Sequence, residues 1–134
     1  MKNSFWVTLA LAVAVMVGQA FTSAFVQEAW DVPDKYENME NPVKASSDVM
    51  SMGKSLYVKH CQSCHGKEGW GDGPKAAQLE TPSGDFSSED FQSQSDGAIF
   101  YKTLEGRGDM PSFKKKIPYE EDIWSIVHYV RTFK

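Results

Sequence analysis

Residues 60–65, which read His-Cys-Gln-Ser-Cys-His, constrain this chain more than any other part of its 134-residue sequence. They contain the pattern Cys61-x-x-Cys64-His65, in which two cysteines are followed directly by a histidine. On a helix these side chains stand three and four positions apart, so all three reach one side. Two such thiols can bond to the vinyl-derived carbons of a porphyrin, and the imidazole can then reach the iron. We therefore predict one covalently bound haem, attached through Cys61 and Cys64 and ligated by His65.

Other uses of the two cysteines are less consistent with the rest of the chain. Cys61 and Cys64 are the only cysteines, so no disulfide framework competes for them. A structural zinc site normally has four Cys or His ligands, and only His60, His65 and His128 could complete such a set. A thioredoxin-like redox pair would follow a strand, whereas the preceding segment has a helical pattern. Zinc, a redox pair and a structural disulfide remain as alternatives to covalent haem.

The second axial position of a haem iron decides its chemistry, because an open position binds small molecules whereas a filled one only passes electrons. Met110 is the only methionine after the cysteine motif, and glycines and a proline shape the loop around it. His60 adjoins the first cysteine, and His128 lies on a predicted helix, so both are weaker candidates. We predict Met110 as the second axial ligand. Its soft, uncharged thioether favours Fe(II) and raises the reduction potential.

The other ring nitrogen of a ligating histidine usually has a hydrogen-bond acceptor that fixes its tautomer. For His65 the candidate acceptor is the carbonyl of Pro74, which follows the Gly-Asp-Gly run at residues 71–73. The alternative role for this proline is to stiffen a turn.

The first 26 residues have the pattern of a targeting segment. Phe5–Val26 is a mostly apolar stretch, and Lys2 is the only charged residue before it. This pattern predicts either a cleaved signal peptide or a retained membrane anchor. In both cases the rest of the chain is exported across a membrane, which for a bacterial protein means the periplasm or the outer side of the cytoplasmic membrane. Contact with the membrane would be made only through an uncleaved N-terminal segment.

The remaining chain is acidic, with a formal charge of −5 against −4 for the whole sequence. No basic stripe suggests binding to nucleic acid. The run of three lysines at residues 114–116 is a local exception. It is either a solvated loop or a docking point for an acidic partner protein.

The chain divides into three parts by pattern: the targeting segment 1–26, an extended linker 27–47, and a domain 48–134. The linker is either a tether or a wrap over the domain surface. Helices are predicted over 48–60, with Ser47 or Asp48 as the N-cap, over 96–105, with Ser95 or Asp96 as the N-cap, and over 119–132. Residues 66–94 are predicted to be loop, with a short helical turn near 74–79.

Apolar residues at helical spacing mark the buried side of each predicted helix. The first helix has Met52, Leu56 and Tyr57, the second has Ile99, Phe100 and Thr103, and the third has Ile123, Trp124, Val127 and Val130.

With these residues in place, the chain resembles class I cytochromes c, specifically the short bacterial monohaem type. The matching segments are residues 53–57, 61–66, 71–74, 109–113 and 123–131. The resemblance implies an all-α cytochrome c fold with three main helices packed around one haem. It also implies that the first and last helices cross near-perpendicularly at Gly53, with Trp124 and Tyr129 as aromatic partners.

The same resemblance implies a function in one-electron transfer, with redox partner proteins and without enzyme activity. The protein would be a periplasmic carrier or the cytochrome subunit of a membrane-bound respiratory or dehydrogenase complex. The alternative is a haem-based sensor or a peroxidase-like enzyme in which Met110 is displaceable.

Overall fold

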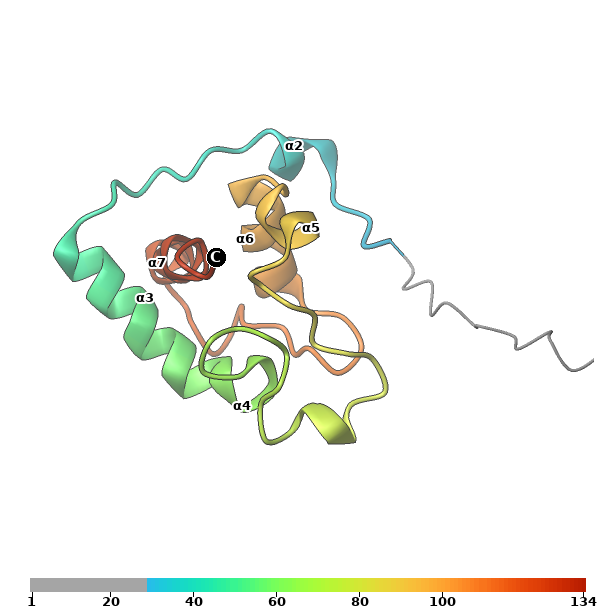
Figure 1. The fold of residues 1–134 in the computed structure, drawn as a ribbon. Helices are drawn as coiled ribbons and strands as arrows, with labels where there is room; N and C mark the ends of the chain where they lie inside the picture. The colour runs from blue at the N-terminus through green and yellow to red at the C-terminus, as the bar shows by residue number, and fades with distance from the viewer. Residues whose placement is uncertain (1–28) are drawn as a thin grey trace, which may run out of the picture.

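The computed structural model describes residues 29–134, which form helices joined by long loops (Figure 1). The helices are α2 (Asp34–Glu37), α3 (Ser47–His60), α4 (Gln62–His65), the 3-10 turn η1 (Ala76–Gln78), α5 (Glu89–Gln92), α6 (Asp96–Glu105) and α7 (Glu120–Val130). Within the described range no strand is formed, so the predicted all-α fold is confirmed. The three main predicted helices correspond to α3, α6 and α7.

The predicted targeting segment, residues 1–26, lies outside the described residues. None of the helices in residues 29–134 is both long enough and apolar enough to cross a membrane.

Serine side chains begin two of the main helices. The hydroxyl of Ser95 accepts the backbone N–H of Ala98 at 3.0 Å, so of the two caps predicted for α6, Ser95 is confirmed and Asp96 lies in the first turn. The cap of α3 is Ser46, whose hydroxyl accepts the N–H of Val49 at 3.2 Å, so the predicted caps Ser47 and Asp48 were wrong. Ser46 has the extended backbone that an N-cap requires, and Asp48 lies in the first turn, where its charge favours the helix dipole.

Helices α3 and α7 cross at Gly53. In Figure 1 α7 is seen nearly end-on while α3 lies across the view, so the two helices do not run side by side. A Cβ atom on Gly53 would lie 2.0 Å from the carbonyl oxygen of Ser125, and only glycine permits this approach. Tyr129 takes the predicted place at the crossing, with its ring centroid 5.3 Å from that of Tyr57. Trp124 instead faces α6.

The core lies between α3, α6 and α7. The predicted stripe of α7 is confirmed, since Ile123, Trp124, Val127 and Val130 are all buried. Trp124 stacks on Phe100 of α6, with ring centroids 4.1 Å apart and planes 10° apart. The predicted burial of Met52 was wrong, because its side chain is 47% exposed. The predicted burial of Tyr57 is confirmed, because the close approach at Gly53 turns the side of α3 that bears Tyr57 toward the core.

The segment before α3 runs around the outside of the helices from α2 (Figure 1). The carbonyl of Met39 accepts the N–H of Gly97 at 3.0 Å, and the Asn41 side chain donates to the carbonyl of Trp124 at 3.1 Å. Nε2 of His128 lies 2.6 Å from the carbonyl oxygen of Val43. These contacts fit a wrap over α6 and α7 rather than a free tether. The boundary between linker and domain at residue 48 stays a prediction.

Candidate haem-binding site

The two cysteines and the adjacent histidine lie where α3 passes into α4. The N–H groups of Cys64 and His65 both donate to the carbonyl of Cys61, at 3.1 and 3.0 Å, so the motif forms one tight helical turn. All three residues and Met110 line one cavity of about 510 Å³. The structure therefore brings together the four residues predicted to hold the haem and its iron.

An adjoining hollow of about 640 Å³ extends this cavity toward the core. It shares Cys61, His65 and Met110 with the first cavity. Buried side chains of α6 and α7 form its inner wall: Ile99, Ile126 and Val130. The site thus combines two thiols and an imidazole at one edge with an apolar interior, which suits a large apolar ring.

Two buried polar atoms in this site lack a protein partner. Nδ1 of His65 and the hydroxyl of Ser83 have no hydrogen-bond partner among residues 29–134, and both residues line the cavity. Buried polar groups are almost always bonded, so such atoms point to a missing component. Together with the free thiols of Cys61 and Cys64, they make the site fit a covalently attached haem.

His65 lies in a largely apolar environment. Its ring stacks on Phe86, with centroids 4.3 Å apart and planes 24° apart. Burial lowers the pKa of His65 to about 4, an effect that the backbone of Ser83 partly opposes. The imidazole is therefore neutral near pH 7, and the neutral form is the one that binds iron.

Among the described residues the structure has no hydrogen bond between the carbonyl of Pro74 and the ring of His65. The turn that contains Pro74 packs on α4 through its backbone instead. The N–H of Gly73 donates to the carbonyl of Cys64 at 3.2 Å, and that of Lys75 donates to Ser63 at 2.9 Å. The role of Pro74 as an acceptor for His65 stays a prediction.

Met110 is held in a tight turn that follows α6. Arg107 and Met110 exchange two backbone hydrogen bonds, of 2.8 and 3.0 Å. Gly106 ends α6 with a φ of +69°, and a Cβ there would lie 2.5 Å from the carbonyl oxygen of Met110. The Asp109 carboxylate accepts the N–H of Glu80 at 2.8 Å, which ties the turn to the loop of residues 79–83 that also lines the cavity.

The alternatives for the cysteines find no support in the arrangement of the described residues. Cys61 and Cys64 are not joined by a disulfide. No group of three or more His, Cys, Asp and Glu side chains within residues 29–134 is placed to hold a metal ion, as a zinc site would need. Burial, with Cys64 nearby, raises the pKa of Cys61 to about 12, so this thiol stays protonated near neutral pH.

The rival histidines differ in their relation to the cavity. His60 lines it beside Cys61, and its ring contacts Phe113 with centroids 5.8 Å apart. His128 is not among the lining residues and lies against the carbonyl of Val43. The geometry therefore supports Met110 over His128 as the second ligand.

Comparison with known proteins shows to which family the chain with this site belongs. Residues 48–130 match the family model described as cytochrome c oxidase, cbb3-type, subunit III. The chain belongs to this family. It is a class I c-type cytochrome, as the motif-based resemblance predicted, and the family implies a covalently bound haem and electron transfer. None of the curated proteins matches the chain.

Two solved structures resemble this cytochrome. One is a chain of the Kuenenia stuttgartiensis reducing HAO-like protein complex Kustc0457/Kustc0458, with 27% identity and a TM-score of 0.63. That match covers 81% of this chain and 52% of the other, so the cytochrome spans about half the length of that relative. The other is the KustC0563 c-type cytochrome, with 32% identity, a TM-score of 0.54, and coverage of 61% and 96%.

Three residues of the site in this cytochrome were not predicted from the sequence. Trp30 lines both cavities and lies under the guanidinium of Arg107, whose carbon is 4.6 Å from the ring centroid. Asp109 fixes the methionine turn, and Phe86 stacks on His65. Only for Asp109 did the sequence hold a signal, because its position beside the candidate ligand suggested a shaped turn.

Replacing Tyr57 by phenylalanine tests how the histidine turn of the cytochrome is anchored. The buried Tyr57 hydroxyl donates to the carbonyl of Gly66 at 2.7 Å, one residue after His65. Tyr57→Phe leaves that carbonyl without this donor, so unfolding by denaturant is expected to require about 1–2 kcal/mol less free energy. Tyr119→Phe is the control, because its side chain is 68% exposed.

The stability of the same two variants is expected to depend differently on pH. Burial raises the pKa of Tyr57 above its ordinary value, so the folded protein keeps a proton that the unfolded chain releases near pH ~10. Wild-type stability should therefore be intact below about pH 10 and should fall above it. Tyr57→Phe should flatten this fall, whereas Tyr119→Phe should not. Equal pH profiles for both variants would contradict the role of Tyr57.

Proposed function

We propose that this protein transfers single electrons through one haem, attached by Cys61 and Cys64 and ligated by His65 and Met110. The observation that carries the proposal is that all four side chains line one cavity. The haem supplies the one-electron redox couple, and the chain holds it, supplies both ligands and keeps water from its inner part. A filled sixth position fits a carrier, since the protein then offers no open site for a substrate.

The ligand types favour rapid electron transfer at a raised potential. A neutral imidazole and an uncharged thioether stabilise Fe(II) more than two imidazoles do. Asp109 and the backbone bridge between Arg107 and Met110 hold the thioether turn in place, so little rearrangement is needed when the charge on the iron changes. We infer no enzyme activity for this site.

The proposed location is the periplasm or the outer side of the cytoplasmic membrane of a bacterium. It is supported by the apolar stretch Phe5–Val26, preceded by a single charge at Lys2. This segment acts either as a signal peptide or as an anchor, and an anchor would be the protein's means of membrane association.

The proposed partners are redox proteins, either met in solution or held as neighbours in a membrane complex. The similar Kuenenia stuttgartiensis chain belongs to a protein complex, which supports the role of a complex subunit. The segment around Tyr36 and Met39 is bound to α6 and not free, so a retained anchor would hold the haem domain close to its attachment point.

Potentiometric titration and exposure to carbon monoxide test this function in the purified holoprotein. We expect a single one-electron wave and no carbon monoxide complex of the reduced protein near pH 7, because Met110 fills the sixth position. Ready binding of carbon monoxide would instead favour a sensor or a peroxidase-like enzyme with a displaceable methionine.

A further inference from the structure

Phe86 forms one wall of the site beside the axial histidine. Its ring stacks on His65 with centroids 4.3 Å apart, and its ring also stacks on Phe91 at the same distance. Tyr57 and Phe133 complete the aromatic surroundings, at 6.5 and 6.4 Å from Phe86. A flat ring stacked on an imidazole restricts the rotation of that imidazole, so the place of Phe86 bears directly on how His65 is oriented.

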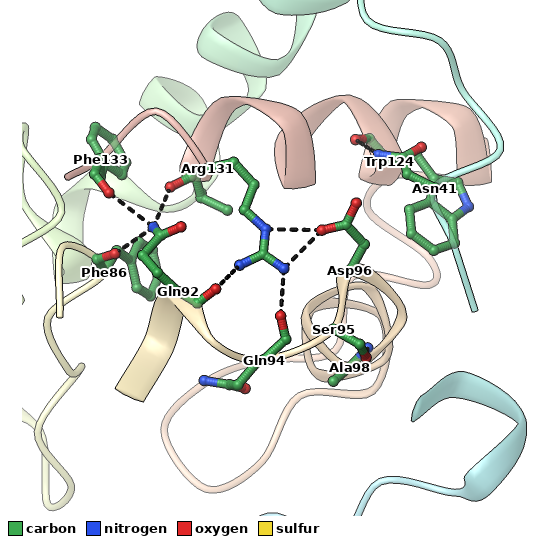
Figure 2. Close-up of polar contacts among 11 residues, drawn as sticks. Asn41, Phe86, Gln92, Gln94, Ser95, Asp96, Ala98, Trp124, Arg131 and Phe133 are labelled. Atoms are coloured by element: carbon green, nitrogen blue, oxygen red, sulfur yellow. Dashed lines mark hydrogen bonds and ion pairs between the residues drawn. The ribbon is translucent and has the colours of Figure 1, made fainter. Parts of the chain in front are cut away.

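The backbone of Phe86 is fixed from two sides. Its N–H donates to the carbonyl of Gly69 at 2.7 Å, in the loop that follows the histidine turn. Its carbonyl accepts the Nε2 amide of Gln92 at 2.7 Å. The same amide also donates to the carbonyls of Phe133, at 2.9 Å, and Val130, at 3.1 Å, so its two hydrogens are shared among three acceptors (Figure 2). Gln92 therefore joins the loop that contains Phe86 to the C-terminal end of α7.

Gln92 is itself held by a side chain from the end of α7. The guanidinium of Arg131 donates to the carbonyls of Gln92, at 2.8 Å, and Gln94, at 2.5 Å. It also pairs with the Asp96 carboxylate at 2.8 Å (Figure 2). The side chains of Arg131 and Asp96 are about a quarter to a third exposed, so solvent weakens their attraction. The directed hydrogen bonds therefore contribute more to holding Arg131 in place than the charge alone does.

We propose that Phe86 is a positioning residue for His65, and that Gln92, held by Arg131, fixes the place of Phe86. The proposal rests on the proposed function only in taking His65 as an iron ligand. Orientation of an axial ligand and the polarity around it tune a haem iron, so the network links the end of α7 to the properties of the iron.

Three single variants of the holoprotein test this inference. Phe86→Leu removes the ring stacked on His65 while it keeps an apolar side chain. Gln92→Ala removes the anchor without touching His65. Phe100→Leu is the matched control, because the buried ring of Phe100 stacks on Trp124, lines neither cavity and has no ring contact with Phe86 or His65 among the described residues. The readouts are the reduction potential and the g-values of the ferric protein by electron paramagnetic resonance.

Phe86→Leu and Gln92→Ala are each expected to shift the reduction potential and the g-values. For each readout, the shift has the same direction in the two variants. Phe100→Leu is expected to lower the melting temperature while it leaves both readouts unchanged. Unchanged readouts in either of the first two variants, or equal shifts in all three, would overturn the proposal. A separate measurement tests the proposed function: if the wild-type protein bound carbon monoxide, the proposed function would be wrong whatever these variants showed.

Discussion

Met110→Ala is expected to lower the reduction potential by roughly 0.1 V or more, a fraction of the ~0.8 V range that axial ligands span. The thioether stabilises Fe(II), and alanine cannot ligate, so Fe(III) gains relative stability and the sixth position opens. The reduced variant should therefore bind carbon monoxide, whereas the wild type should not. Potentiometric titration and absorption spectra with and without carbon monoxide measure both effects.

His128→Gln is the control for the methionine variant. His128 is the rival ligand, but it lies against Val43 and is not among the residues that line the cavity. This variant should therefore keep the wild-type potential and remain closed to carbon monoxide. An unchanged potential in Met110→Ala, or a large change in His128→Gln, would mean that the assignment of the second ligand is wrong.

The double variant Cys61→Ser, Cys64→Ser is expected to lose all covalently held haem. A hydroxyl does not form the thioether bond, so any haem that remained would be held by ligation and packing alone, and denaturation would release it. Haem staining after denaturing electrophoresis measures the effect, with Ser63→Ala as the control between the two cysteines. Staining of the double variant equal to that of the control would exclude attachment through these thiols.

The parts of the structure that sequence could predict are those set by local patterns. Helix α7 was predicted from an apolar stripe that includes Ile123 and Val127, and α6 from its cap at Ser95. The start of α3 was misplaced because residues 46–48 are all of the types that cap helices, so only the backbone conformation selects Ser46. Met52 was misassigned because helical spacing alone does not say which side of a helix meets its neighbour.

The parts that sequence could not predict depend on contacts between distant segments. The sequence did predict the four residues whose chemistry and spacing are distinctive, namely Cys61, Cys64, His65 and Met110. Phe86 was not predicted, because it lies in a loop without periodicity and its position depends on contacts with His65 and the end of α7. The role of Pro74 as the acceptor for His65, which came from turn chemistry, stays a prediction.

Intact-mass analysis of the mature wild-type protein under denaturing conditions tests the central claim most directly. The account predicts the mass of the polypeptide plus one haem, because the thioethers of Cys61 and Cys64 survive denaturation. The same spectrum shows whether residues 1–26 have been removed. A mass equal to that of the polypeptide alone would contradict covalent attachment of a haem through Cys61 and Cys64.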